Sequence, residues 1–371
     1  MKAPMKAVFY QRDFSGDLTP LGLDYNVTRY SKAAVGGPKL CEIEARGADG
    51  DLWRLLELLR CPVEIFTATG DAVWWGYVAS VRLTVRAAGL PGKPRLEVGA
   101  NLDAMTNRIA VAYTNVDVTT GMETRATTAW ADGAESQAEY GIKELLWSAD
   151  AATTEHADAA RDAKLAQEES PVPTVTPTDA AESRATITCR GWWDTLGWLY
   201  YANIGTDAVD TAAQVQAILT AKGQFFSGIW RDVTSSILIR EARDGDATAL
   251  FEAEKLLGMG TTNYRRMLAD VDRTRRVRIY EEPARPTYPY LLWADGRVTD
   301  GLENPIRSET CPGAVWVRLK NIMPASLNAT LLADPSNVFV DESEYDVGRD
   351  RLNIRGRGWP DPWEFPRVKD G

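Results

Sequence analysis

The chain has 371 residues and a formal net charge of −10 at pH 7, from 42 Lys and Arg against 52 Asp and Glu. Its length predicts two or three domains, and its 44% hydrophobic and 25% charged residues are those of an ordinary folded protein. The acidic balance argues against a dedicated nucleic-acid-binding protein, which needs a basic surface to neutralise phosphates.

Neither a leader segment nor a membrane helix is expected from the sequence. The first residues, MKAPMKAVFY, include two lysines but lack the apolar core of a secretory signal. No run approaches the 18 apolar residues that a membrane-spanning helix requires. We therefore expect a protein that is made in a cytoplasm and does not insert into membranes.

Catalytic and metal-binding side chains are scarce. His156 is the only histidine, so a Ser-His-Asp or Cys-His site would have to use it, and no GxSxG motif is present. A zinc or iron site would need almost only carboxylates. The cysteines form no CxxC pair and fit buried free thiols better than disulfides; they are Cys41, Cys61, Cys189 and Cys311. We predict a protein that is not an enzyme and holds no cofactor or metal.

Residues 1–115 are expected to form a first β-barrel-like domain with a short helix. The segment KLCEIEARG alternates apolar and polar residues, which is typical of a half-buried strand. The segment GDLWRLLELL predicts a helix that is capped by Asp51. One face of this helix would carry Leu52, Leu55, Leu56 and Leu59. The next segment predicts two strands joined by a turn at residues 69–71.

Residues 116–185 are expected to form a helical connecting segment and a Pro-rich linker. A first helix would be capped by Asp132 or Ser136. Its apolar face would carry Ala138, Ile142, Leu145 and Leu146. The apolar stripe thins after Trp147, which predicts a separate, more exposed helix. The segment PVPTVTPT, residues 171–178, predicts an extended connector and the best internal boundary of the chain.

Residues 186–285 are expected to form an α+β domain, and residues 286–371 a C-terminal β-rich segment. ATITCRGWW predicts a strand. Two helices should follow, one from Asp210 to Gly223 and one from Asp246 to Gly258, with the aspartates as caps and the glycines as stops. RRVRIYEEP then returns to strand. The expected fold class is mainly β with inserted helices.

The sequence contains 13 tryptophans, an unusual number because large aromatic side chains concentrate in cores and interfaces. Trp74 and Trp75 are adjacent, and so are Trp192 and Trp193. Adjacent side chains on a strand point to opposite faces. We therefore expect one indole of each pair in the core and the other against a second domain or a neighbouring subunit. These four tryptophans are the candidate interface residues.

An arginine-rich run, NYRRMLADVDRTRRVRIY, occupies residues 263–280 and contains six arginines. One interpretation is a phosphate or nucleic-acid site. The other is ordinary ion pairing with Asp270, Asp272 or carboxylates of a neighbouring subunit. In so acidic a chain we favour ion pairing.

Two stretches resemble the hub proteins of phage tails. Residues 30–78, with a Gly-Gly pair, a short helix and a W-G-x-V strand, resemble the opening barrel of these proteins. Residues 130–148, WADGAESQAEYGIKELLWS, resemble their ESxxxYGxxE segment. The matching positions are Glu135, Ser136, Tyr140, Gly141 and Glu144. CRGWWDTLGWLYYA and RRVRIYEEP also fit tail proteins of phages and prophages, so the resemblance runs in order over most of the chain.

The resemblance implies a structural protein of the virion tail. Such a hub is a homotrimer in which two barrel-like, tail-tube-type domains per subunit form a pseudo-hexameric ring. The ring would join the tail tube or a distal tail protein above to a tip or fibre protein below. DNA would pass through it without specific binding. The family supplies no catalytic residues.

Three alternatives remain open from the sequence. The first is a Trp-rich carbohydrate-binding tail protein that recognises a host receptor, because exposed aromatic side chains can bind sugars. The second is the hub of a phage-related contractile injection system. The third is a glycoside hydrolase, which would need two carboxyl groups facing each other across about 5 to 9.5 Å.

Overall fold

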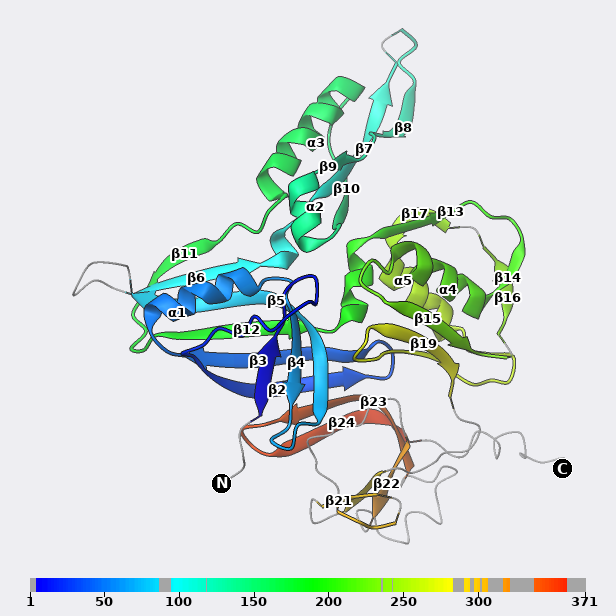
Figure 1. Cartoon of the computed structure of the whole chain (residues 1–371). Coiled ribbons are helices and arrows are strands. Elements are labelled where there is room, and N and C mark those ends of the chain that lie inside the picture. The colour runs from blue at the N-terminus through cyan, green and yellow to red at the C-terminus, as the bar shows by residue number, and fades with distance from the viewer. Residues whose placement is uncertain are drawn as a thin grey trace, which may run out of the picture.

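The computed structural model describes residues 5–86, 95–117, 119–234, 236–241, 243–282, 290–293, 297–300, 302–305, 316–320 and 337–358. Cys311 and the Pro- and Gly-rich end of the chain lie outside these residues. Strands dominate and helices are inserted between them (Figure 1), so the chain is mainly β with an α+β character.

One large sheet organises the molecule, and we call it the main sheet. Its described strands run in the order β1-β4-β5-β12-β3-β2-β23-β22-β20-β21, while β6 joins β5 to β11 and β24 pairs with β23. The bounds are β1 (Lys6–Phe9), β2 (Asp24–Ala33), β3 (Gly37–Arg46), β4 (Pro62–Phe66), β5 (Ala72–Arg86), β6 (Arg95–Asn101), β11 (Thr174–Thr178), β12 (Arg184–Arg190), β20 (Tyr290–Trp293), β21 (Val298–Thr299), β22 (Trp316–Lys320), β23 (Asn337–Asp346) and β24 (Arg351–Gly358).

The length of β5 explains the shape of this sheet. With 15 residues, β5 pairs with β4 along its first half and with β6 along its second half, while β12 lies on its other side. Strands β1 to β5 and β12 curl around an apolar core, yet no hydrogen-bonded ladder joins β1 to β2. Among the described residues no sheet therefore closes into a barrel, and the expectation of two β-barrel-like domains is not confirmed.

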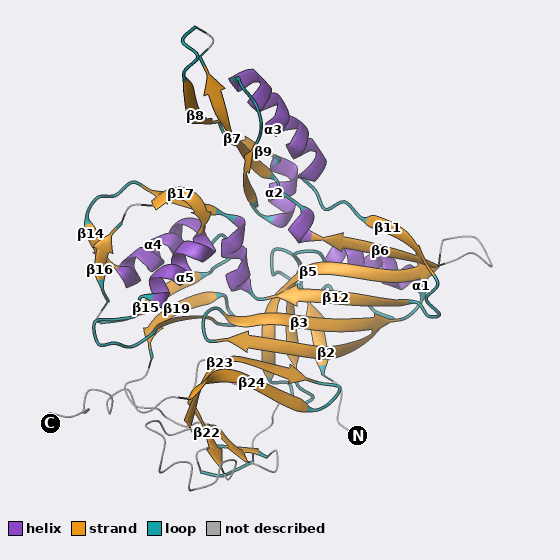
Figure 2. Cartoon of the chain, turned by 180° about the vertical axis from the view of Figure 1, so that it is seen from behind, coloured by secondary structure: helices purple, strands orange, loops and turns teal. Residues whose placement is uncertain are grey.

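A second part of the chain, residues 106–169, projects from the main sheet (Figures 1 and 2). We call it the projecting unit. It comprises β7 (Arg108–Val116), β8 (Glu123–Thr127), β9 (Ala131–Asp132), α2 (Ala134–Tyr140), β10 (Glu144–Ser148) and α3 (Thr154–Glu168). Its chain enters and leaves at one place, where the Thr106 amide donates to the Glu168 carbonyl at 2.7 Å. Helix α3 packs on the sheet through Ala157, which contacts a cluster with Val111 and Tyr113.

A third part, residues 191–282, contains the two longest apolar helices and several small sheets. We call it the α4/α5 unit. Its elements are η3 (Trp192–Trp198), β13 (Tyr200–Asn203), β14 (Ala208–Asp210), α4 (Thr211–Lys222), β15 (Gly228–Asp232), β16 (Leu238–Arg240), β17 (Arg243–Thr248), α5 (Ala249–Gly258), β18 (Met267–Val271) and β19 (Arg276–Glu281). Helices α4 and α5 pack on each other, and β15, β19 and β18 form a three-stranded sheet.

Several expected element boundaries are confirmed and others are corrected. Asp210 caps α4 by accepting a hydrogen bond from the Ala213 amide at 2.7 Å, as expected. Thr248, rather than Asp246, caps α5, because Asp246 lies on β17. The helix predicted to be capped by Asp51 has Ala48 at its N-cap instead, three residues earlier. Asp51 therefore lies inside α1 (Asp49–Trp53), which continues as the 3₁₀ segment η1 (Arg54–Leu58).

The structure also divides the chain differently from the predicted boundaries. Residues 171–178 are not only a connector, because β11 within them pairs with β6. The next strand, β12, lies in the middle of the main sheet, between β5 and β3. The main sheet is therefore discontinuous in sequence, and the projecting unit is inserted into it. In the part of the chain that the structure describes, no helix is long and apolar enough to span a membrane.

The adjacent tryptophans of β5 alternate as strand geometry requires. Trp74 is 0% exposed in the core, and its indole N–H donates to the Ser31 carbonyl at 3.1 Å. Trp75 points the other way and donates to the Val271 carbonyl of the α4/α5 unit at 2.9 Å. The Lys32 ammonium lies 4.8 Å from the centre of the Trp75 ring. The structure thus places Trp75 between two parts of the same chain.

We expect Trp74→Ala to lower the free energy of unfolding by roughly 3–5 kcal/mol, because it empties a buried aromatic site and leaves the Ser31 carbonyl unpaired. Trp230, which is 64% exposed, offers a matched control. Trp230→Ala should change the unfolding free energy by about 0.5 kcal/mol or less. Denaturant titration of both variants measures the difference, and equal effects would contradict this account of the core.

Candidate functional site: a polar junction between three parts of the chain

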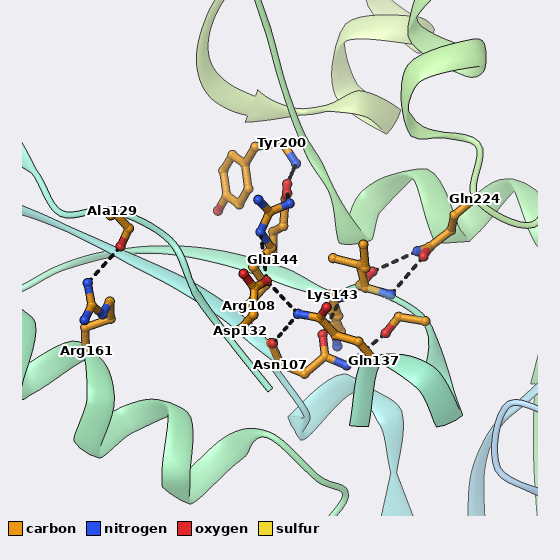
Figure 3. Close-up of polar contacts among 12 residues, drawn as sticks. Asn107, Arg108, Ala129, Asp132, Gln137, Lys143, Glu144, Arg161, Tyr200 and Gln224 are labelled. Carbon is orange, nitrogen blue, oxygen red and sulfur yellow. Dashed lines mark hydrogen bonds and ion pairs between the residues drawn. The ribbon is translucent and has the colours of Figure 1, made fainter. Parts of the chain in front are cut away.

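The segment that resembles ESxxxYGxxE lies at the base of the projecting unit, where it contacts the α4/α5 unit (Figure 3). Glu135 and Ser136 lie in the first turn of α2, which ends at Tyr140. Gly141 stops the helix with a φ of 88°, and a Cβ there would lie 2.4 Å from Phe225 of the α4/α5 unit. Glycine is thus required both by the backbone conformation and by the close contact.

The chain then continues as a strand and not as a helix. Leu145 and Leu146, predicted on the face of one long helix, lie on β10 instead, which pairs in parallel with β7. The helical spacing of apolar residues misled the prediction because the turn at Gly141 interrupts it. This strand places the Glu144 side chain beside Arg108, its partner in the ladder.

Asn107 is the centre of the hydrogen bonds at this junction, and it is 0% exposed. Its side-chain amide donates to Ser136 Oγ at 3.1 Å and to the Gly141 carbonyl at 2.8 Å. Its side-chain oxygen accepts from the Lys143 amide at 2.8 Å, and its carbonyl accepts from Gly133 and from the Gln137 side chain. Asn107 therefore joins the start of β7 to both ends of α2. Ser136 in addition donates to the Glu169 carbonyl at the end of α3.

Glu144 is the charged residue of the junction, with a side chain only 3% exposed. Its carboxylate accepts from Arg108 at 3.0 Å and from the Tyr200 amide at 2.7 Å, and it lies 3.7 Å from the Lys222 ammonium. Arg108 also pairs with Asp132 at 3.2 Å. Because Tyr200 and Lys222 belong to the α4/α5 unit, one buried carboxylate links the two units. Pairing to two cations offsets the cost of burying it.

A second contact between the same units is a reciprocal amide pair. Gln224 donates to the Ile142 carbonyl at 2.8 Å and accepts from the Ile142 amide at 2.8 Å. The Gln224 amide group thus takes the place of a neighbouring strand, because it pairs with both backbone groups of Ile142. The amide and carbonyl of Ile142, between α2 and β10, therefore both have hydrogen-bond partners.

The turns beside β1 and β4 of the main sheet contribute two arginines to the junction. Arg60 is 7% exposed and donates to the carbonyls of Arg12 and Glu139 at 2.9 and 3.2 Å. Burial, followed by the nearby Arg12 charge, lowers the pKa of Arg60 to about 10. Arg12 pairs with the Glu139 carboxylate at 2.6 Å and lies over the Tyr140 ring at 4.8 Å. All three parts of the chain thus meet around α2.

The second tryptophan pair corrects the sequence prediction. β12 ends at Arg190, and Trp192 and Trp193 lie in the 3₁₀ segment η3, so the alternation of a strand does not apply to them. Both are buried, at 3% and 5% exposed. Trp192 packs against aromatic rings, and Trp193 stacks on Phe226 and donates to Glu254 at 3.3 Å. They leave almost no surface for a neighbouring chain.

Each of the six arginines in residues 263–280 has a partner within the chain. Arg275 donates to the Phe225 carbonyl at 3.0 Å and lies over the Phe14 ring. The other five face carboxylates: Arg265 and Glu281, Arg266 and Asp341, Arg273 and Glu64, Arg276 and Asp272, Arg278 and Asp232. These contacts favour the ion-pairing interpretation. Two of the five carboxylates, Glu64 and Asp341, belong to distant strands of the main sheet.

Side chains for chemistry are dispersed. Within the described ranges no three His, Cys, Asp or Glu side chains are placed to hold a metal ion. His156 is exposed in the first turn of α3. Cys41, Cys61 and Cys189 are buried as free thiols, as the sequence predicted, and burial raises the pKa of each.

A pair of glycines lets the α4/α5 unit approach the main sheet. Gly36 and Gly37 both have positive φ, at 89° and 71°. The Gly36 amide donates to the Ala269 carbonyl of β18 at 2.7 Å, and a Cβ on Gly37 would lie 2.1 Å from the Asp270 carboxyl. Asp270 is enclosed by this contact, and burial raises its pKa despite the nearby Lys32.

Comparison with known proteins adds the following similarities. No protein-family model and no curated protein matches the chain. Among solved structures, it is similar to an E. coli component of the type VI secretion system that is itself structurally similar to the T4 bacteriophage tail proteins gp27 and gp5. That match has a TM-score of 0.38 and 10% identity, over 97% of this chain and 78% of the other.

Two further solved structures are tail proteins. One is from Neisseria meningitidis, with a TM-score of 0.40 and 5% identity over 97% of each chain. The other is the 43 kDa tail protein of prophage MuSo2 from Shewanella oneidensis, with a TM-score of 0.28 and 10% identity over 79% of this chain and 95% of the other.

The residues that sequence reasoning missed are mainly Asn107, Arg108 and Arg60. Each is a single polar residue at or just before the start of a strand, β7 or β4, without a spacing pattern that marks it as buried. The motif positions were found because they resemble a known segment, although their partners on other parts of the chain could not be inferred.

We expect Glu144→Gln to lower the free energy of unfolding by roughly 1.5–3 kcal/mol, because it leaves Arg108 and Lys222 without their shared buried carboxylate. Glu123→Gln on the exposed strand β8 is the matched control and should have little effect. Urea unfolding of both variants gives the comparison. An unfolding free energy unchanged in Glu144→Gln would show that the carboxylate does not hold the two units together.

We expect Asp270→Asn to stabilise the protein near pH 7 relative to the native chain. A raised pKa means that the folded state favours the protonated carboxyl of Asp270. The stability that this carboxyl contributes is therefore fully present below its unfolded pKa of about 3.9, and it is lost as the pH rises through the folded pKa. The difference in melting temperature between variant and native chain should therefore grow from pH 4 toward pH 7. A constant difference across that range would contradict the enclosure of Asp270.

Proposed function

We propose that this chain is a structural protein of a phage-type tail and forms the hub at the tail tip or baseplate. The single observation that carries the proposal is the junction around α2. There, the residues of the tail-hub-like motif that contact other parts of the chain fix three units to one another. None of them presents a reactive group to a cavity.

The roles of the motif residues support this proposal one by one. Ser136 and Gly141 bind Asn107, Tyr140 stacks under Arg12, and Glu144 joins two units. Glu135 is exposed in the first turn of α2. A motif whose members hold units in a fixed arrangement suits a protein that transmits position between neighbours in an assembly.

The charges of the chain support a passive channel. Each of the six arginines of residues 263–280 has a partner within the chain, while the net charge remains −10. An acidic surface repels the phosphates of passing DNA and gives it no site at which to bind. We propose that DNA passes the hub without specific contact and that the chain performs no catalysis.

We further propose a homotrimer with a pseudo-hexameric ring. Each end of the main sheet would supply one tube-type element per chain. One end comprises β1 to β6 with β12, and the other comprises β20 to β24. Three chains would then present six such elements to a tail tube or distal tail protein above. Their three projecting units would face the surroundings of the ring. A tip or fibre protein would lie below.

We expect three copies of the chain in the assembled tail tip. The isolated chain should be largely monomeric, since the tube and the tip help to order the ring. The native mass of the purified tip complex, together with its rotational symmetry in electron micrographs, measures the copy number. A stable dimer or tetramer in the particle would contradict the trimeric ring.

A further inference from the structure

An exposed tryptophan stands on the outer strand of the three-stranded sheet in the α4/α5 unit. Trp230 on β15 is 64% exposed, and β15 pairs with β19 on one side only. In this parallel ladder Trp230 lies opposite Arg278, and Asp232 lies opposite Tyr280. These four side chains therefore share one face of the sheet.

The four side chains contact one another in a defined way. The Arg278 guanidinium lies 5.4 Å from the centre of the Trp230 ring and 5.1 Å from that of the Tyr280 ring. It donates through Nη2 to Asp232 Oδ2 at 2.7 Å. Among the residues that the structure describes, the Asp232 Oδ1 oxygen and the remaining N–H groups of Arg278 have no further hydrogen-bond partner, and each of the two side chains is 51% exposed. A flat aromatic surface thus lies beside an oriented acceptor and oriented donors.

A small cavity opens beside this cluster, where the α4/α5 unit meets the main sheet. It has a volume of about 100 Å³ and is lined by Trp75, Asp270, Tyr280, Gly37 and neighbouring residues. This space corresponds to roughly three water molecules. Trp75, Asp270 and Tyr280 line the cavity together with Lys32, whose ammonium lies 4.8 Å from the centre of the Trp75 ring.

We propose that this cluster and cavity form a binding site for a short saccharide that contains an N-acetylated hexosamine. The C–H face of a pyranose ring stacks on the electron-rich face of an indole, as Trp230 provides. Vicinal hydroxyls match the Asp232 oxygen and the Arg278 N–H groups. An acetamido group matches the cavity, its methyl against Trp75, its N–H toward Asp270 and its carbonyl toward Tyr280. The proposal is independent of the hub function.

A protein partner fits this surface less well. The cores of protein interfaces are depleted of Asp, Glu and Lys around their aromatic anchors, whereas Arg is enriched there. The Asp232 carboxylate on the same face as Trp230 is half-exposed and is the feature of this surface that fits a protein interface less well. Asp232 and Arg278 are half-exposed and hold each other in a fixed orientation beside the exposed ring of Trp230. This arrangement matches the hydroxyl groups at the edge of a sugar better.

The experiment is isothermal titration of the full chain with chitotetraose, an oligomer of N-acetylglucosamine, and with maltotetraose, which lacks the acetamido groups. We expect weak binding of chitotetraose and at least tenfold weaker binding of maltotetraose. Trp230→Ala should abolish binding of chitotetraose, and Asp232→Asn should weaken it several-fold. Because Trp230 is exposed, the melting temperature of Trp230→Ala should equal that of the native chain.

Trp53→Ala is the matched control, since Trp53 on α1 is also exposed and lies on another part of the chain. It should bind chitotetraose like the native chain. The proposal is overturned if chitotetraose does not bind at millimolar concentration, if Trp230→Ala binds as well as Trp53→Ala, or if maltotetraose binds equally well. A change of sedimentation on Trp230→Ala without any saccharide binding would also overturn it, in favour of a protein interface.

Discussion

The arrangement of this molecule depends on two buried polar side chains at the base of the projecting unit. Asn107 satisfies the backbone groups exposed where α2 begins and ends, and Glu144 offers its carboxylate to cations from two units. Desolvated groups of this kind are costly when a partner is lost, so they fix a single geometry more strictly than apolar contacts do. Apolar packing supplies the bulk of the stability, and these polar contacts determine how the units are oriented.

The sequence predicted the local elements of the chain better than their arrangement. Strand alternation correctly identified β3, the turn at residues 69–71 correctly indicated the pair β4 and β5, and the Asp210 cap correctly placed the start of α4. These features depend on neighbours within a few residues. The position of β12 between β5 and β3 depends on residues more than 100 positions apart, and no local pattern records it.

The candidate site shows the same division. The motif residues Ser136, Gly141 and Glu144 were identified by resemblance. Strand geometry predicted that one indole of the pair Trp74 and Trp75 lies in the core without indicating which, and the structure places Trp74 there. Trp192 and Trp193 were misplaced because a strand was extended across Gly191, where the chain turns into a 3₁₀ segment. Arginine partners such as Glu64 could not be inferred, because ion pairs between distant elements leave no spacing pattern.

The single point of entry and exit of the projecting unit has an evolutionary consequence. The Thr106 amide and the Glu168 carbonyl close this unit with one hydrogen bond, beside the strands β6 and β11 that flank it. Lengthening a loop whose ends already meet costs little free energy, because the closure entropy grows only slowly with length. Related chains can therefore lengthen or shorten the part of the projecting unit that lies away from Asn107 and Glu144 while the strands on either side remain paired, so that part can diversify faster than the sheet that carries it.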